Sequence, residues 1–211
     1  PTKGETANVS ARVADPDGLA KVALHYRVDP STSTTGRELP DTGTGGDAVA
    51  GDGVFSAQIP AQTSTQLICF RVEATDAFDP AQTTTYPTDA PARECLVRMG
   101  TNPANANDLG QYHFLLNQTN TTLWTRSHKR SNAPVPVTMV YNGERVIYDA
   151  GMYYGAGSFH SRVYSGPSGA LADYNATYPS DDRFLGAKKI ILSMPGAPSD
   201  GRPEPTAQIE Q

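Results

Sequence analysis

The sequence predicts a mostly β fold, with a β-sandwich followed by a second β-rich unit. The 211 residues are enough for two modest domains. Charged residues make up only 18% of the chain, whereas the surfaces of long helices usually carry many of them. Apolar and polar residues alternate with a period of two over several short runs, and turn residues separate those runs.

Charge and hydropathy exclude two classes of partner. The net charge is −5, and the one basic cluster, residues 128–130, is more simply a solvated loop, so we expect no nucleic-acid partner. No apolar run approaches the ~18 residues of a membrane-spanning helix. No signal peptide is visible, and the chain opens at Pro1 as though processed or cut from a larger protein.

The first half carries the runs expected to form the sandwich, at 8–13, 21–28, 54–59, 67–72 and 94–97. Residues 30–53 are expected to be a polar loop too poor in apolar residues to form a strand. Residues 78–91 are expected to be a Pro- and Thr-rich excursion.

The only two cysteines, Cys69 and Cys95, each lie in a strand-like run. We expect a disulfide between them, which would contribute roughly 3 kcal/mol and indicate an oxidising compartment. The alternative is a pair of buried free thiols. Because no histidine cluster accompanies them, a zinc site is not expected.

Residues 100–110 are composed almost wholly of small and turn-forming residues and predict a linker between domains 1–99 and 111–194.

In the second half we expect a strand at 112–116, a short helical or irregular piece at 121–130 around Trp124, and a hairpin. The hairpin joins 135–141 to 144–148 through Asn142-Gly143, which favours a type I′ turn. Further strands are expected near 152–154, 173–178 and 188–193, followed by an extended tail at 195–211 whose last residues could open a helix.

The segment 41–55 resembles a signature of immunoglobulin-like modules in large secreted bacterial proteins. It reads Asp-Thr-Gly at 41–43 and Gly-Asp-Ala-Val-Ala-Gly-Asp-Gly-Val-Phe at 46–55. The resemblance implies that residues 1–99 form an immunoglobulin-like sandwich outside the cell or on its surface.

Residues 112–193 are similar to the N-terminal part of CotH-like (spore-coat) atypical kinases. The stretches that match are 137–143, 146–158 and 182–192. The resemblance implies a partial lobe derived from an α+β fold and a nucleotide site at Gly155, Gly157, Ser158 and Lys188. A strand-to-strand turn at 155–158 is the simpler interpretation of the glycines.

This sequence departs from the kinase pattern in three ways. Tyr154 stands where the family's turn has lysine, strand 173–178 has no lysine, and the family's catalytic carboxylates would lie beyond Gln211. We therefore expect no enzymatic activity from this chain and no binding of ATP with Mg²⁺.

Three aspartates form the candidate metal site of the first half. Asp41, Asp47 and Asp52 could offer carboxylate oxygens to Ca²⁺, although their spacing is not that of an EF-hand. The alternative is a series of Asp-Gly turns in which each aspartate bonds to nearby backbone. Ca²⁺ at these aspartates is the candidate cofactor, and ATP with Mg²⁺ is not expected.

Two patterns suggest a glycan. Tyrosines gather in the second half and, if stacked on one face, could bind a sugar; the simpler alternative is that they belong to ordinary strands. They are Tyr148, Tyr153, Tyr154, Tyr164, Tyr174 and Tyr178. Glycosylation sequons stand at Asn8, Asn117, Asn120 and Asn175.

The function that best accounts for these patterns is an extracellular structural or adhesive module, able to self-assemble and without a complete active site. The partners would be proteins, or further copies of the chain, held through strand edges left unpaired by an incomplete lobe. The alternatives are the nucleotide-binding lobe of a truncated kinase and a carbohydrate-binding module.

Overall fold

The structure is a computed structural model that describes residues 1–62, 65–100, 110–128, 131–155, 173–193 and 208–210. It is mostly β, as predicted. The chain divides into two compact units, Pro1–Gln111 and Tyr112–Gln211. The division falls at the end of the stretch predicted as a linker. Most of that stretch lies outside the described residues, so the linker and the domain limits stay predictions.

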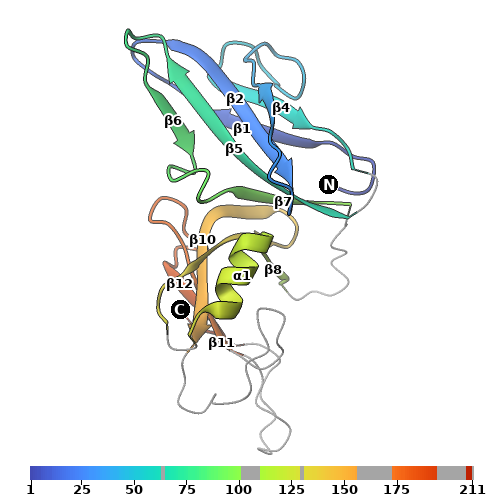
Figure 1. Ribbon diagram of the computed structural model, residues 1–211, viewed down its shortest axis with the longest axis vertical. Coiled ribbons are helices and arrows are strands. Elements are labelled where there is room, and N and C mark those ends of the chain that lie inside the picture. Colours follow the sequence, from blue (N-terminus) through green and yellow to red (C-terminus); the bar gives the residue numbers. More distant parts are fainter. Residues whose placement is uncertain (63–64, 101–109, 129–130, 156–172, 194–207, 211) are drawn as a thin grey trace, which may run out of the picture. The chain divides into compact units, whose positions relative to one another are not determined.

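Two sheets make up the first unit. Its strands are β1 (Ala7–Arg12), β2 (Leu19–Val28), β3 (Thr35–Glu38), β4 (Val54–Ile59), β5 (Gln66–Asp76), β6 (Thr83–Tyr86) and β7 (Cys95–Met99). The larger sheet has the order β3-β2-β5-β6, with β7 also paired to β5, and β1 pairs with β4 in the smaller sheet. Figure 1 shows β1 and β4 crossing behind β2 and β5.

The core of the first unit follows from alternation along its strands. Val22 and Leu24 of β2 lie opposite Ala74 and Val72 of β5, and all four are buried. Residues directly opposite each other in an antiparallel pair share a face of the sheet, so this row forms the core face. His25 and Arg71, one position along, lie on the other face.

Two strands form where the sequence predicted none. Within the predicted loop 30–53, β3 pairs with β2, although all four of its residues are exposed. Within the predicted excursion 78–91, β6 pairs with β5. Both are edge strands held by main-chain hydrogen bonds, which apolar periodicity cannot detect.

The second unit is a sheet of the order β13-β12-β11-β10-β9-β8. Its elements are β8 (Tyr112–Leu115), α1 (Gln118–Arg126), β9 (Val135–Tyr141), β10 (Arg145–Gly155), β11 (Asp173–Thr177), β12 (Lys189–Ser193) and β13 (Gln208–Glu210). The core gathers Trp124 of α1 with apolar residues of β9, β10, β11 and β12. The short strand β13 lies where the sequence suggested an extended tail or the start of a helix.

The predicted hairpin is confirmed. Asn142 and Gly143 join β9 to β10 with φ values of 53° and 74°, so both turn residues adopt the left-handed conformation of a type I′ turn. Among the described residues, no helix is long and apolar enough to cross a membrane.

Candidate functional site: an acidic loop on the first unit

The acidic loop, residues 40–53, connects β3 to β4 and contains the three candidate aspartates. It turns repeatedly at glycines with positive φ, a conformation that glycine adopts without the strain of a Cβ atom. These are Gly43, Gly45, Gly46, Gly51 and Gly53. The glycines of the sequence signature therefore allow a long polar loop to fold back on itself.

Folding the loop brings the three carboxylates together. One oxygen from each of Asp41, Asp47 and Asp52 lies within 4.8 Å of the other two. Asp47 is buried, Asp41 is half-buried and Asp52 is exposed. The structure thus gathers the three residues that the sequence singled out.

Backbone amides orient these carboxylates. Gly51 and Gly53 donate to the two oxygens of Asp41, at 2.6 and 2.9 Å. Gly43 donates to Oδ2 of Asp47 at 2.6 Å, and Val54 donates to Oδ1 of Asp52 at 2.9 Å. The Asp-Gly turns of the alternative interpretation are therefore present as well. Each carboxylate oxygen can accept more than one bond, so the two arrangements are compatible.

The loop is also attached to the strands beneath it. Asn8 of β1 donates from Nδ2 to the carbonyl of Gly46 at 2.9 Å, and the amide of Ser56 in β4 donates to the carbonyl of Pro40 at 3.1 Å. A Cβ atom on Gly46 would lie 1.9 Å from Oδ1 of Asn8. These hydrogen bonds hold the acidic loop, and with it the carboxylates, against β1 and β4.

Such an arrangement suits a hard cation. Ca²⁺ binds about six to eight oxygen atoms, mostly from carboxylates, carbonyls and water. The three aspartates would supply the charged ligands. Three carboxylates this close repel one another, and a divalent cation between them would turn that repulsion into attraction.

The structure describes only two of the four residues that the kinase resemblance implies, and it places these two at the ends of different strands. Gly157 and Ser158 lie outside the described residues, Gly155 ends β10, and Lys188 is exposed just before β12. Tyr154, where the family has lysine, is buried with its ring centroid 5.0 Å from that of Trp124.

The predicted disulfide is absent. Cys69 and Cys95 are buried free thiols, which was the alternative interpretation. Cys95 lies opposite Phe70 in the β5–β7 pair, whereas Cys69 lies opposite Leu96. Because neighbouring positions of a strand point to opposite faces, the two thiols lie on opposite sides of the sheet.

The thiol of Cys69 lies beside a charged cluster that the sequence did not reveal. Arg27 donates from Nε to Glu94 at 3.0 Å and pairs through Nη1 with Asp29 at 3.2 Å. Its hydrogen bonds to Glu94 raise its pKa. The three side chains are only 8 to 13% exposed. Since 67 positions separate Arg27 from Glu94, no local pattern could have predicted their pairing.

Three of the clustered tyrosines belong to the core or its margin. Tyr154 and Tyr178 are buried, and Tyr174 packs with a centroid distance of 5.8 Å from Trp124. They cannot form an exposed platform for a sugar, because their rings pack in or against the hydrophobic core of the second unit. Tyr148 and Tyr153 are half-buried, and Tyr164 lies outside the described residues.

Three of the four sequons are also inaccessible. The side chain of Asn117 caps α1 by accepting from the amide of Asn120, and Asn120 donates to the carbonyl of Pro136 at 3.0 Å. Asn175 is buried in β11. Only Asn8 is exposed, and its amide already bonds to Gly46.

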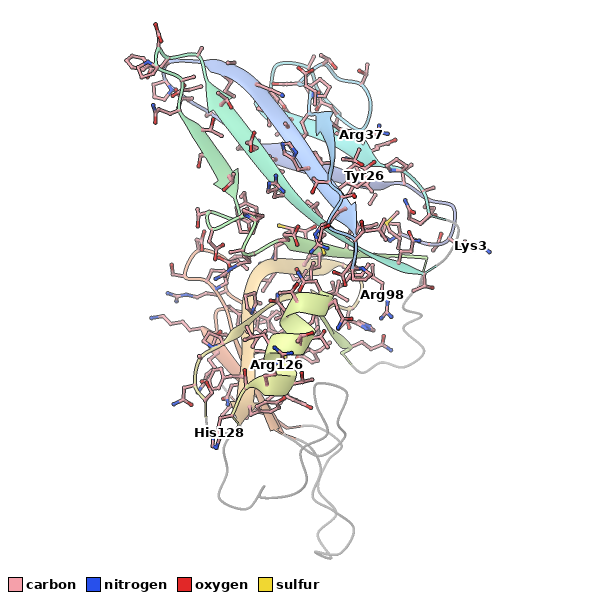
Figure 2. All side chains as sticks on the ribbon, viewed as in Figure 1. Lys3, Tyr26, Arg37, Arg98, Arg126 and His128 are labelled. Carbon is pink, nitrogen blue, oxygen red and sulfur yellow. The ribbon has the colours of Figure 1, made fainter. Side chains whose placement is uncertain are left out.

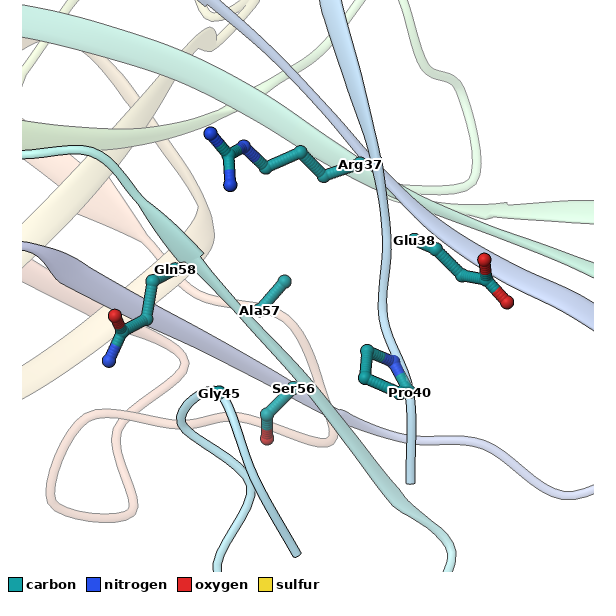
Figure 3. A pocket seen from close by; sticks show the side chains of 7 residues that line it. All are labelled: Arg37, Glu38, Pro40, Gly45, Ser56, Ala57 and Gln58. Atoms are coloured by element: carbon teal, nitrogen blue, oxygen red, sulfur yellow. The ribbon is translucent and has the colours of Figure 1, made fainter. Parts of the chain in front are cut away.

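A hollow of about 370 Å³ opens beside the acidic loop, between β3 and β4. It is lined by Arg37, Glu38, Pro40, Gly45, Ser56, Ala57 and Gln58. Figure 3 shows the side chain of Arg37 extending from β3 toward β4, whereas that of Glu38 points away. In Figure 2 the labelled basic side chains Lys3, Arg37 and Arg98 of this unit stand well apart.

Comparisons of the chain with known proteins found no match among family models, curated proteins or solved structures.

Proposed function

We propose that this chain is an extracellular structural or adhesive module of a larger secreted or surface protein, and that its first unit binds Ca²⁺ at Asp41, Asp47 and Asp52. The observation that carries the proposal is the convergence of the three carboxylate oxygens within 4.8 Å. The loop that holds them lies between two strands of a sandwich, so a bound cation would strengthen a connection between the two sheets.

The electrostatics support this role. Every carboxylate already accepts a backbone amide, which fixes its direction before a cation arrives. Extracellular calcium modules typically bind with dissociation constants of about 10⁻⁴ to 10⁻³ M. A site with three charged ligands on a loop that is partly open to solvent fits that range.

The test is thermal unfolding with CaCl₂, MgCl₂ or EDTA. A ligand that binds only the folded state stabilises it by about 2.7 kcal/mol at a hundredfold excess over its dissociation constant. We expect Ca²⁺ to raise the unfolding temperature, EDTA to reverse the rise, and Mg²⁺ to have less effect because it requires octahedral geometry.

Matched variants locate the effect. Asp47→Asn should abolish the response to Ca²⁺ while leaving a folded protein. Asp15→Asn is the control, since Asp15 only accepts from the amide of Asp17 in a separate turn. An unchanged unfolding temperature of the native protein at millimolar Ca²⁺ would exclude the site. A rise with Mg²⁺-ATP would instead favour the kinase-lobe alternative.

A further inference from the structure

We propose that the free edge of β1 pairs antiparallel with β1 of a second copy, joining two small sheets into one. This inference does not depend on Ca²⁺ binding. It differs from the sequence-based expectation, which placed the pairing edge in the second half of the chain.

The hydrogen bonds of β4 show which groups of β1 point outward. The amide of Ser56 bonds to Pro40, away from β1, and Ser56 lies opposite Ser10. Val13, three positions on, donates toward Gly53 on the β4 side. The main-chain groups of Asn8, Ser10 and Arg12 therefore point to the free edge. Among the described residues, none of these three amides donates a hydrogen bond.

The core face of the larger sheet is open beside this edge. Tyr86 of β6 lies opposite Val72 and so shares the core face, yet it is 49% exposed. Because β4 is tied to the β3 side through Pro40, the free edge of β1 faces the β6 side. A strand added to β1 would therefore cover Tyr86.

Two other edges of this unit, those of β3 and β6, are protected in ways that β1 is not. On β3, Arg37 lies opposite the buried Leu24 and extends toward β4, and such an inward charge blocks strand addition. The short strand β6 is followed at once by Pro87. Strand β1 has six residues and contains neither proline nor a bulge.

Strand β1 is complementary to itself, so the partner that we propose for it is β1 of a second copy of the chain. With Ser10 facing Ser10 across a twofold axis, Arg12 faces Asn8 of the other copy, so the only charge in β1 meets a neutral side chain. The buried row of Ala7 and Val9 would continue on the same face, toward Tyr86 of the other copy. The contact would be isologous and closed, giving a dimer.

Disulfide trapping of the 211-residue chain tests this register. In Ser10→Cys the two new thiols would face each other with Cα atoms about 5.5 Å apart, close enough for a disulfide. In the matched variant Arg12→Cys they would be roughly 13 Å apart, since each residue of a strand spans about 3.3 Å. The native cysteines do not interfere, because both are buried.

We expect Ser10→Cys to give a covalent dimer under mild oxidation and Arg12→Cys to remain monomeric. In sedimentation equilibrium, Ser10→Pro should weaken dimerisation by about tenfold or more, because it removes an outward amide that the β1–β4 pair does not use. Circular dichroism of the same variant checks whether it is folded. A native protein that stays monomeric at millimolar concentration, equal cross-linking of both cysteine variants, or a dimer that survives Ser10→Pro would each overturn the proposal.

Discussion

At the scale of single residues, burial governs the chemistry of the two cysteines. Desolvation, assisted by the charge of Glu94, raises the pKa of both Cys69 and Cys95 to about 12. A thiol reacts as its thiolate, so these groups are inert at neutral pH in the folded protein. The thiol of Cys69 therefore lies beside the cluster of Arg27, Asp29 and Glu94 without forming a redox site with Cys95.

This burial predicts a pH dependence of stability. A group whose pKa is raised on folding contributes stability below its unfolded pKa, and that contribution is lost as the pH rises through the folded pKa. We therefore expect the thiols to lower the free energy of unfolding between pH 9.0 and about 12. Urea unfolding across this range should show a shallower decline for the Cys69→Ala/Cys95→Ala variant. An equal slope, or a mass lower by the two thiol hydrogens, would contradict the assignment of free thiols.

A second prediction at this scale concerns the contact between the acidic loop and β1. Gly46→Ala places a Cβ atom on Oδ1 of Asn8 at a φ of 106°, so Asn8 must turn away and lose its bond to the loop. We expect a loss of about 2–3 kcal/mol in urea unfolding. Gly45→Ala is the control, because the space around it is open and only its φ of 65° is strained. Equal losses in both variants would show that the Asn8 contact contributes nothing.

At the scale of elements, α1 shows how a short helix is held by its surroundings. Its nine residues are few for a stable isolated helix. Asn117 caps its N-terminus, Arg126 lies in its last turn, and Trp124 is 1% exposed in the core. The packing of Trp124 in the core therefore supplies stability that the helix propensity of these nine residues does not.

Replacing that side chain should be costly. Trp124→Ala is expected to reduce the free energy of unfolding by about 3–5 kcal/mol, because a large buried side chain is removed from the core. Leu123→Ala, next to it on the exposed side of the helix, should change stability by less than about 1 kcal/mol. Urea unfolding followed by circular dichroism measures both. Comparable losses would mean that α1 does not pack through Trp124.

At the scale of the whole molecule, the two units divide the candidate roles. All three carboxylates and the free edge of β1 lie in Pro1–Gln111. The aromatic core around Trp124 lies in Tyr112–Gln211.

This division predicts that Pro1–Gln111 alone retains the cation site. Expressed by itself, it should unfold cooperatively and show the same Ca²⁺-dependent rise in unfolding temperature as the whole chain, because the chain supplies every predicted ligand within that unit. Circular dichroism melts of both proteins provide the comparison. A fragment that folds but does not respond to Ca²⁺, while the whole chain does, would place essential ligands in the second unit.

Much of the fold could be predicted from local patterns. Alternation in β2 and β4, the Asn142-Gly143 turn and the piece around Trp124 all appear in the structure near their expected positions. The edge strands β3 and β6 were missed, because neither has a buried row to leave a signal in the sequence. The three aspartates were recognised by residue type and by the glycines between them.

The amino-acid sequence by itself determined the mostly β class, the hairpin and the candidate acidic loop, since each depends on side-chain periodicity or on turn residues close together in the chain. Tertiary structure alone decided the rest. Strand register placed Cys69 and Cys95 on opposite faces, paired Arg27 with Glu94, buried Tyr154 and three sequons, and left the edge of β1 open. These features depend on which strand lies beside which, and local patterns carry no information on contacts between distant residues.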